Sequence, residues 1–289
     1  MAKNLFKKSN IGTIIFFVLN ALLIIGLFSA FNFDNLLVIV ALYAVSVALA
    51  FSRFGDWLLC VMVGARKMTR ADMKARMRPL LEVVYKKAMK KTPGLSNQLR
   101  LKVTYGPEAN AYAIGRRTIC VTEGLFKLPD DVIMGIFAHE TAHLALKHTH
   151  IQLLIGGGNM IMAALILIIK FIYMLIAAIA LGLAWTETRR NGCMSGCITA
   201  LPGLLIAGII RLWTRICMLL LMWSSRENEF EADKYASELG YGYELAKAID
   251  VIGTNAPQDS FLKALYSTHP NAHERIARLQ QLGVPYYRY

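Results

Sequence analysis

The sequence predicts a mostly α-helical integral membrane protein, with four transmembrane helices and a cytoplasmic α+β domain that contains a small β-sheet. Three observations predict this fold. Hydrophobic residues make up 56% of the 289 residues and gather in four long blocks, which is typical of membrane spans. Basic residues flank these blocks. In one polar segment between the blocks, the apolar residues change from the spacing of a helix to the alternation with polar residues that is typical of strands.

Two apolar runs open the chain. Residues 11–31 are long enough to cross a hydrocarbon core of roughly 30 Å, and residues 36–51 follow through a turn that suits a hairpin of helices. A cleaved signal peptide is the alternative for the first run, but its apolar region is too long and no small-residue cleavage pattern follows it. Residues 160–185 and 197–223 form a second predicted hairpin.

These spans divide the chain into four parts. Residues 1–52 hold the first two transmembrane helices, 53–155 a cytoplasmic region, 156–224 the second hairpin, and 225–289 another cytoplasmic region. Most of the Lys and Arg residues lie in segments on one side of the membrane, and this asymmetry predicts that side to be cytoplasmic. Both termini are therefore expected in the cytoplasm.

The net charge of +13 indicates anionic partners. Because the basic residues flank apolar blocks and are not interleaved with aromatic residues in a soluble domain, we expect the lipid bilayer as a partner and no nucleic acid. Lys170, Arg211 and Arg215 lie within the apolar runs, where charge is costly. Three explanations of these cations are open. Their side chains could snorkel to the membrane surface, they could line a polar groove for substrate, or the two apolar runs could span the membrane only in part.

The five cysteines fall into two groups. Cys60, Cys120 and Cys217 stand in apolar or strand-like contexts and are predicted to be reduced core residues. Cys193 and Cys197 share a polar loop, where a disulfide forms only if the loop faces an oxidising compartment.

Residues 53–92 are basic and helix-periodic, with a helix start predicted at "TRAD" and Leu80, Leu81, Val83 and Val84 on its apolar side. The pattern then changes to alternation. The stretches "LRLKVTY", "ANAYAIG" and "RTICVTEG" predict three short strands separated by turn residues.

A helix is predicted to start at Pro129 and Asp130, since proline and acidic residues suit a first turn. It carries "HETAH", an H-E-x-x-H motif. His139 and His143 are four residues apart and share one helical face, so both imidazoles can reach one metal ion. Glu140 stands between them, where it can take a proton from a metal-activated water.

A catalytic zinc site needs a third protein ligand. A metzincin motif would continue with glycine and a third histidine, but Leu146 and Thr149 occupy those positions. His148 and His150 are therefore interpreted as charges at the helix end.

The better candidate for the third ligand lies downstream, in "NEFEAD". Glu229 and Asp233 are four apart and share a helical face, so the glutamate could bind zinc while the aspartate orients a ligand imidazole. Glu227 and Glu231 are chemical rivals, but each lies about 200° around the helix from Glu229.

Together, "HETAH", two apolar spans and "SRENEFEAD" resemble the membrane-bound zinc metallopeptidases of the HtpX type, gluzincins related to the CAAX prenyl proteases. The resemblance covers nearly the whole chain. It implies one Zn²⁺ per chain, bound by His139, His143 and Glu229. It also implies that Glu140 is the general base and that Asp233 supports a ligand.

Two further matches add to the resemblance. "NAYAIG" stands where the family has an edge strand that holds the substrate backbone, and "STHP" contains His269, which the family uses to stabilise the oxyanion. Arg275 and Ile276 continue the family's "HP…RI" pattern. The implied substrate-binding residues are Asn110, Ala111, Tyr112 and Ala113.

The expected function is that of a membrane-integrated endopeptidase. The resemblance implies hydrolysis of peptide bonds in damaged or misfolded membrane proteins, at the cytoplasmic face of a bacterial inner membrane and in a stress response. Alternatives are prenyl-protein processing, a non-catalytic scaffold and an intramembrane protease. Intact Glu140 disfavours the scaffold, and Lys147, directly after the motif, favours a site at the interface over one within a span.

Overall fold

The computed structural model describes residues 11–30, 36–150, 226–253 and 272–287, together with nine isolated positions between 153 and 212. The third and fourth predicted spans fall almost wholly outside these residues. So do the three cations within those spans and the three cysteines after residue 190. They are Lys170, Arg211, Arg215, Cys193, Cys197 and Cys217.

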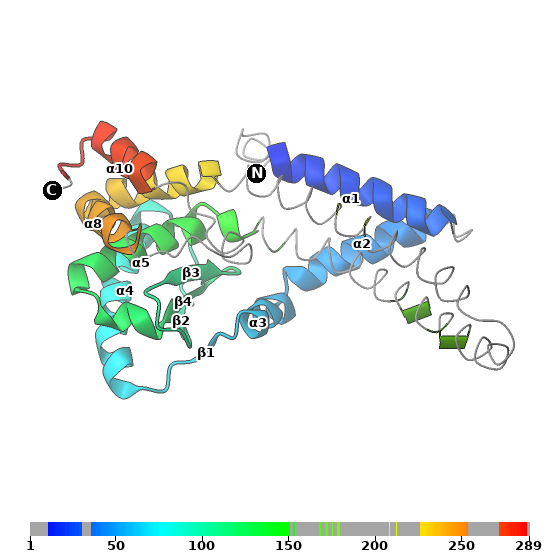
Figure 1. The fold of residues 1–289 in the computed structure, drawn as a ribbon, viewed down its shortest axis with the longest axis horizontal. Coiled ribbons are helices and arrows are strands. Elements are labelled where there is room, and N and C mark those ends of the chain that lie inside the picture. The colour runs from blue at the N-terminus through cyan, green and yellow to red at the C-terminus, as the bar shows by residue number, and fades with distance from the viewer. Residues whose placement is uncertain are drawn as a thin grey trace, which may run out of the picture.

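The first two apolar runs form α1 (Ile11–Ala30) and α2 (Leu36–Ala50), which lie side by side and extend away from the rest of the fold (Figure 1). Many of their large apolar side chains are exposed, among them Leu22 and Leu37. No helix among the described residues meets the length and composition of a membrane span alone. The segments Val40–Ala50 and Arg53–Met62 do so as a pair bent by 70°.

The predicted strands are present in a small mixed sheet with the order β1-β2-β4-β3. β2 and β4 pair in parallel, and the outer pairs are antiparallel. β1 has only two residues, too few for a periodic signal in the sequence. The strands are β1 (Arg66–Lys67), β2 (Arg100–Thr104), β3 (Ala111–Ile114) and β4 (Thr118–Thr122).

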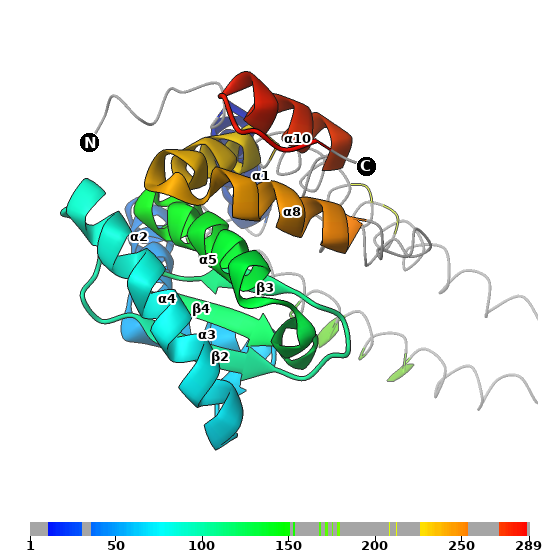
Figure 2. The same cartoon turned by 90° about the vertical axis from the view of Figure 1, so that its left-hand side faces the viewer.

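Helices cover both faces of this sheet (Figures 1 and 2). One face carries α4 and α5, and α8 packs on α5 with α10 beyond it. Cys60 of α3 packs with Ile114 and Cys120 on the other side, and both cysteines are buried free thiols as predicted. The helices are α3 (Arg53–Met62), α4 (Ala71–Lys91), α5 (Asp130–Ala145), α8 (Gly242–Gly253) and α10 (Ala272–Gln281), and a 3₁₀ turn, η3 (Glu123–Lys127), follows β4.

A second helical segment precedes α8. Residues 226–236 form a helix that leads through the π-helical turn η4 (Ser237–Tyr241) into α8. Because α8 packs against α5, this segment is held beside the helix that carries the H-E-x-x-H motif.

The buried side of α4 corrects one expectation. Met73, Met77, Leu81 and Val84 are buried at spacings of three and four residues, as one helical face requires. Val83, predicted to lie on the same side, is 49% exposed, because a step of one residue turns the side chain about 100° around the helix.

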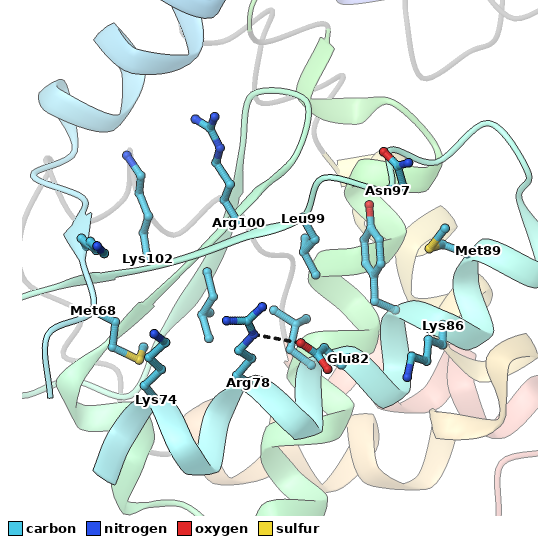
Figure 3. A pocket seen from close by; sticks show the side chains of 14 residues that line it. Met68, Lys74, Arg78, Glu82, Lys86, Met89, Asn97, Leu99, Arg100 and Lys102 are labelled. Carbon is cyan, nitrogen blue, oxygen red and sulfur yellow. Dashed lines mark hydrogen bonds and ion pairs between the residues drawn. The ribbon is translucent and has the colours of Figure 1, made fainter. Parts of the chain in front are cut away.

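A basic hollow lies between α4 and the edge of the sheet formed by β1 and β2, with a volume of about 650 Å³ (Figure 3). Lys74 and Lys86 project from α4, and Arg100 and Lys102 from β2. Exposed cations on this side of α4 account for the basic pattern seen in the sequence.

The two neighbouring valines of α4 allow a matched test of the core. Val84→Ala is expected to lower the free energy of unfolding by about 1–3 kcal/mol, because Val84 is fully buried and its truncation leaves a cavity. Val83→Ala is expected to change it by less than about 0.5 kcal/mol. Thermal unfolding of the full chain in detergent measures both, and equal shifts in Tm would contradict the assigned faces.

Candidate metal centre

The helix α5 is anchored at its first turn. Pro129 precedes the helix, and Asp130 and Asp131 stand in the first turn, as expected from the sequence. Asp130 accepts a hydrogen bond from Arg76 of α4 at 2.7 Å, and Asp131 pairs with Lys247 of α8 at 2.6 Å. These contacts hold α5 between the two helices that flank it.

In its last two turns, α5 presents His139 and His143 to Glu229 of the 226–236 helix. His139 Nε2 lies 3.2 Å from one carboxylate oxygen of Glu229, and His143 Nε2 lies 3.3 Å from the other. The two Nε2 atoms are 3.1 Å apart. The structure therefore brings the three predicted ligands together, with ligand atoms within 4.8 Å of one another.

These separations fit a zinc ion. Ligand atoms about 2.0–2.1 Å from a tetrahedral zinc are about 3.3 Å from each other. The two imidazole nitrogens are 3.1 Å apart, and each lies 3.2 or 3.3 Å from one of the two Glu229 oxygens. The donor set is also chemically suited, because two imidazoles and one carboxylate form a well-known catalytic zinc site that leaves a fourth position open.

Glu140 points from α5 toward the edge of the sheet. Its Oε2 atom accepts a hydrogen bond from the backbone N–H of Ala113 at 2.7 Å, and its side chain is buried. Ala113 belongs to β3, the outermost strand next to β4. The predicted base and the predicted substrate strand are therefore in direct contact.

A buried ion pair supports His139 from behind. Asp233 Oδ1 lies 2.9 Å from His139 Nδ1, and both carboxylate oxygens of Asp233 accept hydrogen bonds from Arg275 at 2.8 and 2.6 Å. Burial raises the pKa of the Asp233 carboxyl, but the charge and hydrogen bonds of Arg275 outweigh it and lower that pKa to about 2. An ionised Asp233 accepts the Nδ1 proton of His139 and leaves Nε2 to bind metal.

A second chain of contacts supports His143. His148 Nδ1 lies 3.1 Å from His143 Nδ1, and His148 Nε2 lies 3.4 Å from Glu231 Oε2. If His143 Nδ1–H donates to His148 Nδ1, and His148 Nε2–H donates to Glu231, then His143 keeps the lone pair of its Nε2 atom for a metal ion. The interpretation of His148 as a residue that simply ends the helix is wrong, because its side chain is buried and packs against His143.

His150 also departs from expectation, whereas the two rival glutamates do not. His150 packs against the ring of Phe51, and burial lowers the pKa of its imidazole, so it is not a helix-end charge either. Glu231 contacts His148 and is not one of the three residues of the donor cluster found among the described residues. Glu227 is exposed, in agreement with its rejection as a ligand.

The remaining predicted site residues have mixed outcomes. Ala111, Tyr112 and Ala113 form β3, whereas Asn110 stands just before the strand, where its side chain accepts a hydrogen bond from the N–H of Ala111 at 2.8 Å. His269 lies outside the described residues.

Arg275 has a role that sequence reasoning missed. It holds Asp233 and also lies 3.8 Å from Glu229. The only signal for it in the sequence is its place in the "HP…RI" pattern, which carries no information on what the side chain contacts.

The fold and the site define a class of protein. A helix with H-E-x-x-H that meets a glutamate from a second helix, with its own glutamate against an edge strand, is the arrangement of a gluzincin-type metallopeptidase. The particular family follows from sequence comparison. The chain belongs to Peptidase family M48, whose pattern matches residues 74–282.

Individual relatives agree with the family. The chain is 26% identical over 200 residues to a "Protease HtpX homolog" of Caldanaerobacter subterraneus, a match covering 62% of this chain and 64% of that protein. It is also 26% identical over 254 residues to a protein of the same description from Tropheryma whipplei (strain Twist), covering 80% of each. The chain thus spans slightly less than two thirds of the first relative and four fifths of the second. The resemblance to HtpX-type proteins is confirmed.

A solved structure is also similar. The crystal structure of S. mikatae Ste24p matches with a TM-score of 0.47 and 19% sequence identity, covering 90% of this chain and 61% of that one.

The support of His143 by His148 can be tested by metal binding. His148→Ala is expected to weaken zinc binding by about 10–100-fold, because His143 loses the partner that fixes its ring. His150→Ala is the matched control, since His150 lies against Phe51 and touches no ligand, and it should leave zinc affinity unchanged. Competition with a chelating dye measures both; equal affinities for the two variants would remove His148 from the site.

Proposed function

We propose that the chain is a zinc-dependent endopeptidase integrated in a membrane. The observation that carries this proposal is the meeting of His139, His143 and Glu229 with the correct spacing for zinc, with Glu140 beside the edge of the sheet. Zinc bound there would act as a Lewis acid and lower the pKa of a bound water to about 7.

The chain's own residues supply the proton transfers. The carboxylate of Glu140 adjoins the donor cluster, where it accepts the proton of the attacking water and later gives it to the leaving amine. Its hydrogen bond to Ala113 fixes it beside the strand that is proposed to hold the substrate. Asp233, fixed by Arg275, keeps His139 in the tautomer that binds metal.

β3 offers a backbone edge for an extended peptide. Ala111 pairs with Val121 and Ala113 with Ile119, while Asn110 accepts a hydrogen bond from the N–H of Thr122. Since alternate residues of an antiparallel strand face its partner, the backbone groups of Ala111 and Ala113 point away from β4. A substrate strand can add to that edge beside Glu140. His269 is proposed as the donor to the oxyanion.

The proposed substrates are membrane proteins or peptides derived from them, as part of quality control of damaged proteins. The support is the similarity of the chain to HtpX homologues and the exposed apolar surface of α1 and α2. We place both termini and the site on the cytoplasmic side, from the distribution of Lys and Arg. The four-part division at residues 52, 155 and 224 belongs to the same proposal, and prenyl-protein processing is its alternative.

The role of Glu140 as the base gives a direct test. Glu140→Gln is expected to retain stoichiometric zinc and to lower kcat for a membrane substrate by about 10²–10⁴-fold, because an amide cannot take up the proton. Metal analysis and cleavage assays on the purified full chain in detergent measure the two properties. Cleavage by Glu140→Gln at the wild-type rate would contradict the proposed mechanism.

The third ligand is tested by metal removal. Glu229→Ala is expected to lose bound zinc, and a chelator is expected to abolish wild-type cleavage until zinc is restored. Glu227→Ala is the matched control, because Glu227 lies two residues away on the exposed side of the same helix. Full zinc occupancy in the Glu229 variant would show that another residue completes the site.

A further inference from the structure

The short helix α3 has an apolar outer face. Phe54, Trp57, Val61 and Met62 are all exposed, with Trp57 at 56% and Met62 at 72%. Their spacing places them on one side of the helix. Cys60 on the opposite side is buried against the sheet. A helix this apolar on its outer side requires a partner for that face.

The bend before α3 is built into the backbone. Ser52 caps the helix, with its Oγ accepting a hydrogen bond from the N–H of Phe54 at 3.0 Å. At Gly55 a Cβ atom would lie 1.9 Å from the carbonyl oxygen of Ala50, so only glycine permits the close approach of the two helices. The chain therefore turns by 70° from the uncharged and mostly apolar α2 into α3.

We propose that α3 lies along the surface of an anionic phospholipid leaflet, with its Phe54–Trp57–Val61–Met62 face at the boundary between headgroups and acyl chains. The proposal rests on the placement of the chain in a membrane under the proposed function. If α2 runs along the membrane normal, a 70° bend brings α3 close to the membrane plane. Amphipathic helices with aromatic residues on the apolar face are typical of that position.

A basic cavity beside α3 complements an anionic surface. It has a volume of about 550 Å³, and its charged lining consists of Arg53, Arg116, Arg117 and Lys147, together with His150. No acidic residue lines it among those described. In the same described part of the chain, the buried Nε atoms of Arg116 and Arg117 have no hydrogen-bond partner. Two of these side chains, Arg116 and Arg117, also contact Asp56 on the inner side of α3, and the cationic lining as a whole suits the phosphate of a lipid headgroup.

The inner face of α3 connects this surface to the proposed substrate strand. Asp56 accepts a hydrogen bond from the N–H of Arg116 at 3.3 Å and pairs with the Arg116 and Arg117 side chains at 3.5 and 3.9 Å. Gly115 has a φ of +59°, and a Cβ atom there would lie 2.2 Å from Asp56 Oδ1. These residues form the turn between β3 and β4, so α3 sets the height of β3 above the leaflet.

The depth of Trp57 tests the placement of α3. The chain has four tryptophans, so the contribution of Trp57 is obtained as the difference in fluorescence between the wild type and Trp57→Phe. Both are measured as the full chain in lipid nanodiscs. We expect brominated acyl chains to quench it by about twofold or more, because an interfacial indole reaches the acyl boundary. Quenching by aqueous acrylamide and not by brominated lipid would overturn the proposal. So would crosslinking of position 61 to a second copy, which would make the face a protein interface.

The basic cavity is tested with spin-labelled phosphatidylglycerol. Arg53→Gln with Lys147→Gln is expected to reduce the preference for this lipid over phosphatidylcholine by about fivefold or more. Lys74→Gln with Lys86→Gln, in the hollow of Figure 3, is the matched control and should leave it unchanged. An unchanged preference in the first variant would overturn the headgroup assignment. Displacement of the lipid by inorganic phosphate would also overturn it, in favour of a site for free phosphate.

These readouts are independent of catalysis. A chain that cleaves no peptide but still shows quenching of Trp57 by brominated lipid would contradict the proposed function and support the inference. A chain that cleaves normally but keeps Trp57 exposed to water would support the proposed function and contradict the inference.

Discussion

The contact of Glu229 with His139 and His143 is the constraint on which the rest of the structure depends. Three donor side chains from two helices far apart in sequence lie with their atoms within 4.8 Å of one another, as a shared metal ion requires. The packing of α5 against α8, the anchoring of the first turn of α5 and the clamp by Arg275 all serve this alignment. Because burying charged groups is costly unless they are paired, each of these buried groups has a charged or polar partner in reach.

The two ligand imidazoles are supported by different means. His139 rests on a carboxylate that is ionised by a buried guanidinium, which is a rigid and strongly charged support. His143 rests on another imidazole, which in turn reaches the partly exposed carboxylate of Glu231. Both chains of contacts end on the 226–236 helix or on α10, so the C-terminal part of the chain supplies the third donor of the cluster and also contacts the first two.

Much of this site could be predicted from the sequence because its signals are local. The four-residue spacing in "HETAH" and "NEFEAD" fixes a helical face, and alternation identified β2, β3 and β4. The predictions that were wrong or missing concern two kinds of feature. Some depend on contacts between residues far apart in the sequence, and others on geometry that the helical repeat of the sequence does not resolve. The burial of His148 depends on Glu231, 83 residues later, and the role of Arg275 on Asp233, 42 residues earlier. Val83 differs from Val84 by one step around a helix, and the bend at Gly55 is a close approach of two backbones that composition does not encode.

The hydrogen bond from the N–H of Ala113 to Glu140 bears on how binding of a substrate could activate a protease. An extended peptide that pairs with β3 competes for the same amide hydrogen that now holds the carboxylate. Under the proposed function, a peptide docking along β3 would displace the Glu140 carboxylate from the Ala113 amide, so that substrate binding would change the position of the proposed base. On the same proposal, a folded protein whose strands are already paired would leave this contact intact, whereas an extended unpaired segment would displace it.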